Sequence, residues 1–285
     1  MKLLSLRSRR LGLDLAPEAG GSIARFTADG SVDLLRPATP QVLASGKGNN
    51  AACYPLVPFS GRIAEGRFSF EGAEVVVPSN WPDQRHPMHG DGWARPWMVK
   101  RIDECCADVV YEHDAKEGWP FRYRARQTYR LDDEALTVGM SLENLEAHAV
   151  PAGLGLHPFF VRESDTTLHC RTRHMWRTDT EVLPIEQIAV PAQASFAAAR
   201  RVDETTLDNG FEGWDGHAAI VWPKAGLRLE LIATEPFRDV VIFVPPGRPY
   251  FCVEPVSHVP GAIGSTHLVA GGALAGEITF RLSNL

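Results

Sequence analysis

"FRYRARQTYRL", residues 121–131, and "ALTVGMSLE", residues 135–143, decide the fold class of this chain. In the first stretch, apolar or aromatic side chains alternate with arginines and a threonine, so one face is apolar and the other is polar. The second stretch repeats the alternation, and "DDE" at 132–134 favours a turn between them. The two stretches therefore predict a β-hairpin with one face in the core and one face in water.

The same period-two signal recurs along the chain, for example in "LRLEL" at 227–231. The 25 glycines and 21 prolines divide the sequence into many short segments. Helical periodicity is weak, and the best candidate for a helix is "QASFAAARR" at 193–201. We find no internal repeat and no linker. We therefore expect residues 1–285 to form a single all-β domain of packed, mostly antiparallel sheets.

Composition limits the classes of partner. A chain of 285 residues with 44% hydrophobic residues can bury a large core. Its net charge is −6 and it has no basic block, so we expect neither a nucleic acid nor an anionic membrane as partner. The first residues lack the apolar segment of a signal peptide, and no run is long enough to span a bilayer. These features predict a cytoplasmic protein.

The five cysteines are odd in number and widely spread, and no CxxC pair occurs. This pattern predicts reduced thiols, with neither a disulfide framework nor a zinc knuckle.

Arg62 lies in "FSGRIAEGRFSFEG", residues 59–72, between a Ser-Gly turn and a probable hairpin. A guanidinium there can donate two hydrogen bonds to sugar hydroxyls or to a carboxylate. The alternative is a surface arginine paired locally, for example with Glu65. Spacing alone favours the alternative, because arginines in loops are common.

His89 lies in "HPMHGDGWARPW", residues 86–97, a stretch rich in turn-forming residues and tryptophan. An imidazole beside aromatic rings suits a carbohydrate pocket, whereas the alternative is a surface loop whose Trp93 and Trp97 pack inward. The two interpretations have similar weight. The spacing from His86 to His89 also suits a metal, but no third ligand is close in sequence, so we expect none.

His157 and Glu254 each precede a proline, which biases their backbones toward an extended, fixed conformation. His157, in "GLGLHPFF" at 153–160, is either a general acid or base or a buried core histidine, and the latter is commoner. Glu254 ends an apolar stretch in "YFCVEPVSH" at 250–258, where a carboxylate is costly unless it is paired or functional. For Glu254 we favour function over an outward-turned side chain. His258 is expected to be a loop residue.

Asp208 lies in "LDNGFEGW", residues 207–214. Asn209-Gly210 is a strong turn signal, and Asp208 would then cap that turn. The functional alternative is a carboxylate that accepts hydrogen bonds from substrate hydroxyls. Taken by itself, the sequence favours the turn.

Taken together and in this order, "GRIAEGRFSF", "HGDGW", "HPFF", "DNGF" and "VEPVSH" resemble the motifs of the aldose 1-epimerase (galactose mutarotase) family, over residues from about 55 to 260. The sequence departs from the family pattern at Gly61, where the family has an asparagine, and at Trp93, where it has a phenylalanine. The resemblance implies a large antiparallel β supersandwich, in agreement with the strand pattern. It also implies an isomerase that interconverts the α and β anomers of a monosaccharide without a cofactor or metal, as a monomer or homodimer.

By this resemblance Glu254 is the general base, His157 is the general acid, and Arg62, His89 and Asp208 hold the sugar oxygens. Three alternatives remain open. A sugar-binding or sensing protein would keep the pocket without catalysis, and a glycoside hydrolase would use Asp208 and Glu254 as its two carboxylates. A mutarotase for a phosphorylated or sulfonated sugar would need a basic group at the pocket rim, for which the candidates are Arg95, Arg162 and Arg248.

Overall fold

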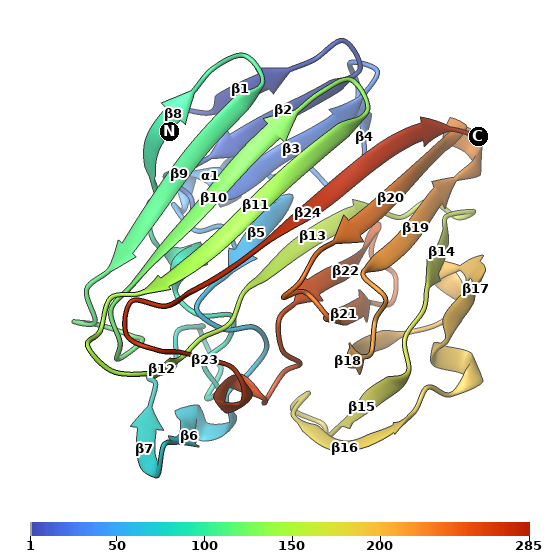
Figure 1. Cartoon of the computed structure of the whole chain (residues 1–285). Coiled ribbons are helices and arrows are strands. Elements are labelled where there is room, and N and C mark those ends of the chain that lie inside the picture. Colours follow the sequence, from blue (N-terminus) through green and yellow to red (C-terminus); the bar gives the residue numbers. More distant parts are fainter. Residues whose placement is uncertain (1) are drawn as a thin grey trace.

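The computed structural model describes residues 2–285, and two large antiparallel sheets dominate it (Figure 1). The eleven-stranded sheet contains, in spatial order, β1 (Leu4–Arg7), β2 (Leu11–Ala16), β3 (Ser22–Ala28), β5 (Cys53–Leu56), β13 (Gly155–Val161), β22 (Tyr250–Val256), β21 (Asp239–Val244), β18 (Leu207–Glu212), β15 (His174–Thr178) and β16 (Pro184–Ala189), with β4 (Val32–Asp33) paired to β3. The nine-stranded sheet contains β17 (Phe196–Arg201), β14 (Thr167–Cys170), β19 (His217–Trp222), β20 (Leu227–Ala233), β24 (Ala273–Asn284), β11 (Ala135–Asn144), β10 (Tyr123–Leu131), β9 (Cys106–His113) and β8 (Met98–Ile102).

The remaining elements are short. Two small sheets pair β6 (Arg67–Phe70) with β7 (Ala73–Val76) and β12 (Val150–Pro151) with β23 (His267–Leu268). Within residues 2–285 the only α-helix is α1 (Pro40–Ala44), and the six 3-10 turns cover residues 64–66, 92–94, 192–194, 202–204, 223–225 and 263–265. None of these helices is long and apolar enough to cross a membrane.

The predicted hairpin is confirmed as β10 and β11, which pair from Tyr123 opposite Asn144 to Leu131 opposite Leu136. Every second residue of β10 is buried, as the alternation requires. The two large sheets pack face to face through aromatic side chains. The ring centroid of Phe280 on β24 lies 6.1 Å from those of Phe26 on β3 and Phe160 on β13. The predicted all-β supersandwich is therefore correct.

The predicted helix at 193–201 is wrong. Residues 192–194 form a single 3-10 turn, and Phe196–Arg201 form the edge strand β17, which pairs with β14. A nine-residue segment by itself gains too little from helix formation to offset nucleation. Pairing with β14 satisfies backbone groups along one side of the segment and buries Phe196 in the core.

The predicted turn at Asn209-Gly210 is also wrong, because both residues lie inside β18 and pair with β21. The Asn209 side chain donates a 2.9 Å hydrogen bond to the backbone oxygen of Trp176. A Cβ on Gly210 would lie 2.9 Å from the ring of Pro260. The glycine therefore allows a close approach of two segments and does not mark a turn.

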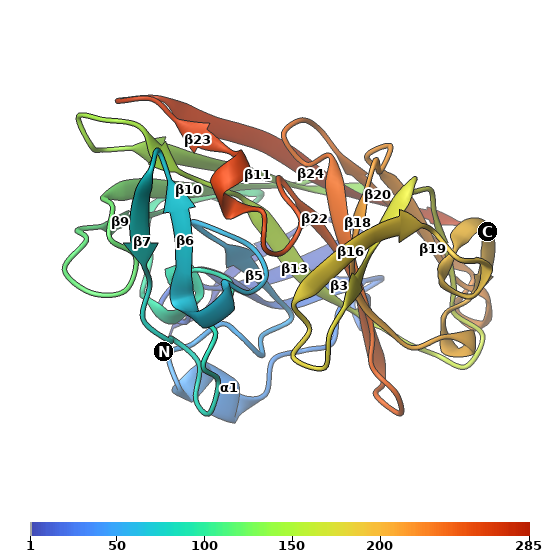
Figure 2. The same cartoon turned by 90° about the horizontal axis from the view of Figure 1, so that it is seen from below.

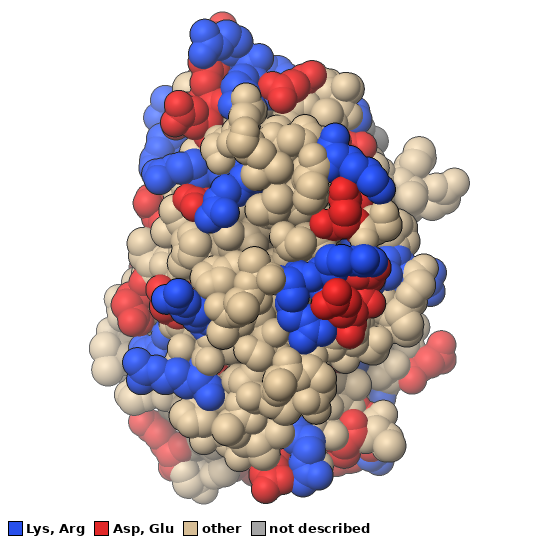
Figure 3. Space-filling view, turned by 90° about the vertical axis from the view of Figure 1, so that its right-hand side faces the viewer, with Lys and Arg blue, Asp and Glu red and all other residues tan. Residues whose placement is uncertain are grey.

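Figure 3 shows basic and acidic side chains interspersed over one side of the molecule. All five cysteines are free thiols, three of them buried, while Cys105 is exposed and Cys106 is half-buried.

Candidate active site

A pocket of about 220 Å³ lies on the eleven-stranded sheet and brings the five predicted site residues together. Arg62, His89, His157, Asp208 and Glu254 all line it, although they are separated by up to 192 residues in sequence. Figure 2 shows the β6–β7 hairpin on one side of β13 and β22, and β16 on the other. The volume is below the range usual for drug-sized ligands, so the pocket suits a smaller molecule.

The floor of the pocket is one row of cross-strand neighbours. In the registers of β5, β13, β22, β21 and β18, this row runs Tyr54, His157, Glu254, Val241, Gly210. All five residues line the pocket. Because neighbours across strands point to the same face, the sheet register alone aims the imidazole and the carboxylate into one space.

His157 and Glu254 form a direct pair, with 3.3 Å between Nε2 and Oε1. Both residues are buried, at 7% and 2% exposure. The imidazole packs against the rings of both Tyr54 and Phe159, with each centroid 4.6 Å away, and those two rings also contact each other, with 6.2 Å between their centroids. The guanidinium of Arg36 lies 4.0 Å from the centroid of the Phe159 ring. The stack fixes the plane of the imidazole, so its Nε2 is held toward the carboxylate.

Burial disfavours the charge of each member of this pair. It raises the pKa of Glu254 well above the usual value, and the nearby Asp208 carboxylate raises it further, while Arg62 opposes. It lowers the pKa of His157 well below the usual value, and His89 and Arg36 act in the same direction. At rest, therefore, the pair is favoured as a neutral imidazole and a neutral carboxyl that titrate together.

Arg62 and His89 come from two loops that are fastened to each other. The His89 backbone N–H donates to the oxygen of Gly61 at 2.9 Å, and the Gly61 N–H donates to His89 Nδ1 at 3.1 Å. Arg62 and Met88 also form an isolated antiparallel bridge. Asn80 closes the His89 loop, because its amide bonds to Met88 N, Met88 O and Gly90 O.

His89 is held as a neutral hydrogen-bond donor. Its φ of 63° is in the left-handed region, which only a few non-glycine residues adopt. Burial and, second, the charge of Arg62 lower the pKa of His89 to about 3. Since Nδ1 accepts from Gly61, the ring proton must reside on Nε2. The structure thus places a fixed N–H beside the His157–Glu254 pair, with 5.5 Å between the two imidazole centroids.

Gly61 and Glu65 lie close to Arg62 in the first loop, and His86 precedes His89 in the second. Arg62 does not pair with Glu65, whose carboxylate contacts Arg85 at 3.0 Å. Gly61 departs from the family pattern for a steric reason, because its φ is 69° and a Cβ would lie 2.4 Å from Pro260. His86 Nδ1 accepts from the backbone N–H of Glu65 at 2.9 Å, and His86 is not among the residues that line the pocket.

Other parts of the same loops are buried. Trp93 and Trp97 pack inward with 0% and 3% exposure, as the structural alternative for this loop predicted. Asp91, two residues after His89, lies 2.8 Å from His113 Nδ1 and accepts a hydrogen bond from Tyr123.

His258, which follows β22, is a loop residue, as predicted. It is buried, and its Nε2 accepts a hydrogen bond from Ser60 N at 3.4 Å.

Asp208 lies on β18, opposite Phe243 of β21, and lines the pocket. Burial raises its pKa, and Arg62 opposes this shift. The loose motif that suggested this residue therefore selected a residue that lines the pocket, although the local turn that it implied is absent.

One group in the pocket has the spacing of a metal site, since ligand atoms of His157, Cys252 and Glu254 lie within 4.8 Å of one another. Burial and the Glu254 carboxylate raise the pKa of the Cys252 thiol well above its usual value. The thiolate, which is the form that binds metals, is therefore disfavoured there. The donor set fits an acid–base pair better than a resident cation.

Sequence reasoning missed several pocket residues. Tyr54 and Trp81 were not singled out, and neither was Trp176, which reaches the pocket from β15. Nothing local marks them, because their roles depend on which strands are neighbours. Phe159 was visible in "HPFF", two residues after His157 and hence on the same face of a strand, so the period-two rule could have found it.

Comparison with known proteins identifies the family. The model of the aldose 1-epimerase family matches residues 2–268. This chain belongs to the aldose 1-epimerase family. The uncharacterised protein YphB of Escherichia coli K12 is 31% identical over 268 residues, covering 91% of this chain and 89% of that protein.

Two solved structures have the same fold as this aldose 1-epimerase family member. A protein from Escherichia coli K12, provisionally described as an aldose 1-epimerase, is 30% identical with a TM-score of 0.92, covering 100% of this chain and 99% of its own. A galactose mutarotase-like protein from Clostridium acetobutylicum is 17% identical with a TM-score of 0.88, covering 99% and 95%. The galactose mutarotase-like fold is therefore shown over the whole chain.

Proposed function

We propose that this protein is a mutarotase that interconverts the α and β anomers of a free, neutral aldose. The observation that carries this proposal is the buried His157–Glu254 pair, 3.3 Å apart, at the floor of a small pocket. Anomer exchange needs one group that removes a proton from the O1 hydroxyl and one that delivers a proton to the ring oxygen O5. A carboxylate and an imidazolium side by side supply both.

In the forward step Glu254 takes the O1 proton, and the electrons of the O–H bond form the C1=O1 carbonyl. The C1–O5 bond breaks, and its electrons move to O5, which takes a proton from His157. Rotation about C1–C2 presents the other face of the carbonyl. Closure reverses both transfers, so the enzyme recovers its protons and no oxidant, reductant or covalent intermediate is involved.

The resting electrostatics are compatible with these roles. A carboxylate with an imidazolium has the same number of protons as a carboxyl with a neutral imidazole. One proton shift across the 3.3 Å contact therefore converts the resting pair into the ionised pair. Sugar hydroxyls that replace water in the pocket can donate to the carboxylate and stabilise its charged form.

Arg62, His89 and Asp208 hold the sugar in this proposal. The His89 Nε2–H and the Arg62 guanidinium donate to sugar oxygens, and the Asp208 carboxylate accepts from hydroxyls. The lining residues Trp81 and Trp176 offer apolar ring faces to the C–H groups of a pyranose.

The charges in the pocket favour a neutral sugar. Among the described residues that line it, Arg62 is the only cation, and it faces the carboxyl groups of Asp208 and Glu254. Arg95 donates instead to Glu117, Arg162 donates to the backbone of Pro245, and Arg248 is exposed and does not line the pocket. A phosphorylated or sulfonated sugar would bring its negative charge beside Asp208 and Glu254, with Arg62 as the only lining cation to receive it.

The test follows the optical rotation, or exchange by NMR, of pure α-anomers of galactose, glucose, arabinose, fucose and glucose 6-phosphate. We expect faster equilibration of one or more neutral sugars and none of the phosphorylated one. Saturable sugar binding without faster exchange would make the protein a sugar-binding protein. Release of the alcohol from an aryl glycoside would make it a hydrolase.

A further inference from the structure

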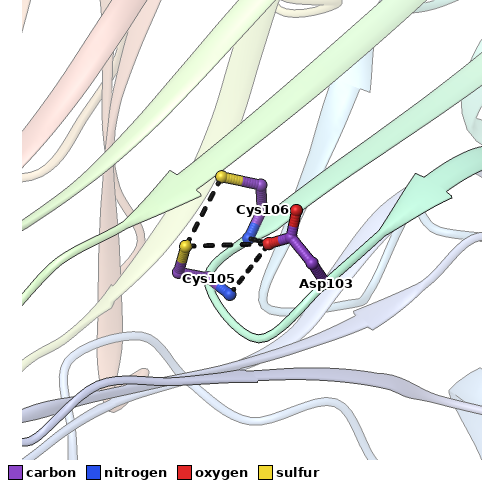
Figure 4. Close-up of side chains that lie close together, drawn as sticks. All are labelled: Asp103, Cys105 and Cys106. Carbon is purple, nitrogen blue, oxygen red and sulfur yellow. Dashed lines mark hydrogen bonds between the residues drawn. The ribbon is translucent and has the colours of Figure 1, made fainter.

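The turn between β8 and β9 carries a second cluster of reactive side chains, outside the sugar pocket. It contains Asp103, Cys105 and Cys106, whose ligand atoms lie within 4.8 Å of one another (Figure 4). β8 is an edge strand of the nine-stranded sheet and β9 is its neighbour, so the turn that joins them lies at one edge of that sheet. We propose that this turn binds one thiophilic divalent cation of the zinc class through two thiolates and one carboxylate oxygen.

The turn brings together two side chains that a regular strand would separate. Consecutive side chains in a strand point to opposite faces, yet the sulfurs of Cys105 and Cys106 are 3.6 Å apart. The Asp103 carboxylate causes the bend, because its Oδ1 accepts from the backbone N–H groups of Cys105 at 3.2 Å and Cys106 at 2.7 Å. A third contact places the Cys105 sulfur 3.6 Å from the same oxygen.

Neighbouring backbone holds this arrangement in place. Asp103 N donates to Cys106 O at 2.9 Å, which closes the turn, and Leu131 N donates to Cys105 O at 2.8 Å. Arg7 N donates to Glu104 O at 3.1 Å, which ties the turn to β1. The donor atoms are therefore positioned before any ligand arrives, and little ordering is needed on binding.

Two of the three distances between donor atoms match tetrahedral zinc. Zinc–sulfur bonds of about 2.3 Å at a tetrahedral angle put two sulfurs about 3.8 Å apart. With a zinc–oxygen bond of about 2.1 Å, sulfur and oxygen are about 3.6 Å apart. The corresponding distances here are 3.6 Å for sulfur to sulfur and 3.6 Å for Cys105 sulfur to Asp103 Oδ1. A disulfide fits less well, because adjacent α-carbons about 3.8 Å apart are closer than disulfides normally allow.

Charge and access also suit a cation. Two thiolates and a carboxylate leave one excess negative charge around a divalent ion, and Arg101 lies 2.6 Å from the other oxygen of Asp103. Cys105 is exposed and Cys106 is half-buried, so the fourth position is open to water. Binding releases the two thiol protons, as zinc–thiolate sites require, and no electron transfer is involved.

The probe is Co²⁺, added to the full-length protein kept reduced with a phosphine. We expect one Co²⁺ per chain, with sulfur-to-cobalt charge-transfer absorption and the visible bands of a tetrahedral ion, and displacement by Zn²⁺. Cys105→Ser and Cys106→Ser should each lose the charge-transfer absorption. Asp103→Asn should weaken binding by more than about tenfold, since even outer-shell partners of metals have effects of this size.

Two control variants distinguish the metal site from a general effect of acidic residues and from the mutarotase proposal. Glu104→Gln removes an adjacent acid that is outside the cluster and should bind Co²⁺ as the wild type does. The double variant Cys105→Ser/Cys106→Ser should keep the wild-type rate of any sugar anomer exchange, because its side chains lie outside the pocket. Absence of thiolate–cobalt absorption in the wild type, or its persistence in the double variant, overturns the metal site and leaves the mutarotase proposal untouched.

Discussion

The two histidines of the pocket are held in opposite ways. His157 lies in the middle of the sheet on β13, in an ordinary extended conformation, packed against the rings of Tyr54 and Phe159. His89 lies in a loop at a φ of 63°, and hydrogen bonds from Gly61 and Asn80 hold its segment. A strand places a side chain through its register, whereas a loop must be tied at several points to be as well defined.

This difference separates chemistry from positioning. The strand-borne pair, His157 and Glu254, would move protons, and it lies on two adjacent interior strands of the eleven-stranded sheet. The loop-borne pair, Arg62 and His89, would hold sugar oxygens. We therefore expect changes on the strands to abolish turnover with little change in stability, and changes in the loops to alter both.

The largest effect is expected from the strand pair. Glu254→Gln removes the proton acceptor but keeps size and burial, and His157→Asn removes the titrating ring. Each should lower kcat for anomer exchange by about 10²–10⁴-fold, with the thermal midpoint nearly unchanged. Polarimetry measures turnover, and thermal unfolding measures the midpoint.

The matched controls, Glu186→Gln and His174→Asn, change exposed residues of β16 and β15 and should retain wild-type turnover. Wild-type turnover in either pocket variant would remove the role assigned to that residue.

Gly90→Ala tests the loop. Gly90 has a φ of 67°, and a Cβ would lie 1.9 Å from the Val57 backbone oxygen. Gly72→Ala is the matched control, because Gly72 has a φ of 80° with no atom within 4 Å of a Cβ. The control should lose about 1–2 kcal/mol of unfolding free energy from strain alone. Gly90→Ala should lose about 1–3 kcal/mol more and also displace His89. Equal losses in urea unfolding would show that the loop tolerates the contact.

Asn80→Ala breaks the three side-chain hydrogen bonds that close the His89 loop. Unpaired backbone groups should lower the unfolding free energy by about 1–3 kcal/mol. Because Asn80 makes no proton transfer, the loss of activity should appear mainly in KM. Asn284→Ala, which loses one exposed bond from Arg10, is the control and should change neither quantity. A fall in kcat at constant KM would contradict a purely positioning role.

The smallest effect concerns pH and His258, whose Nε2 accepts from the backbone N–H of Ser60. Burial lowers the pKa of His258 to about 4, whereas the unfolded side chain titrates near 6.5. Between these values the unfolded state binds the extra proton, so this residue makes stability rise with pH and fall as pH drops below about 6.5. His258→Gln should therefore reduce the slope of unfolding free energy against pH by up to about 1.4 kcal/mol per unit. Urea titrations at pH 5 and 6.5 give the unfolding free energies of wild type and variant. An equal change of this free energy with pH in both proteins would contradict the assignment.

Much of the fold was readable locally. The alternation in residues 121–131 and 135–143 gave a hairpin in the correct place, because side-chain period and burial are properties of the strand itself. His157 and Glu254 were identifiable since a following proline fixes the backbone, and an ordered set of motifs then assigned them roles. The segment 193–201 failed for the opposite reason: its helical composition was overridden by an edge pairing with β14, which lies elsewhere in sequence.

What the sequence by itself determined was the fold class, the family resemblance and five of the residues that line the pocket. Only the tertiary structure decided that His157 and Glu254 touch, that Tyr54 and Phe159 stack on the imidazole, and that Cys105 and Cys106 turn their sulfurs together. The reason is physical. Local patterns fix which face a side chain takes, but contact between distant segments depends on strand order and register, and those are set by packing of the whole core.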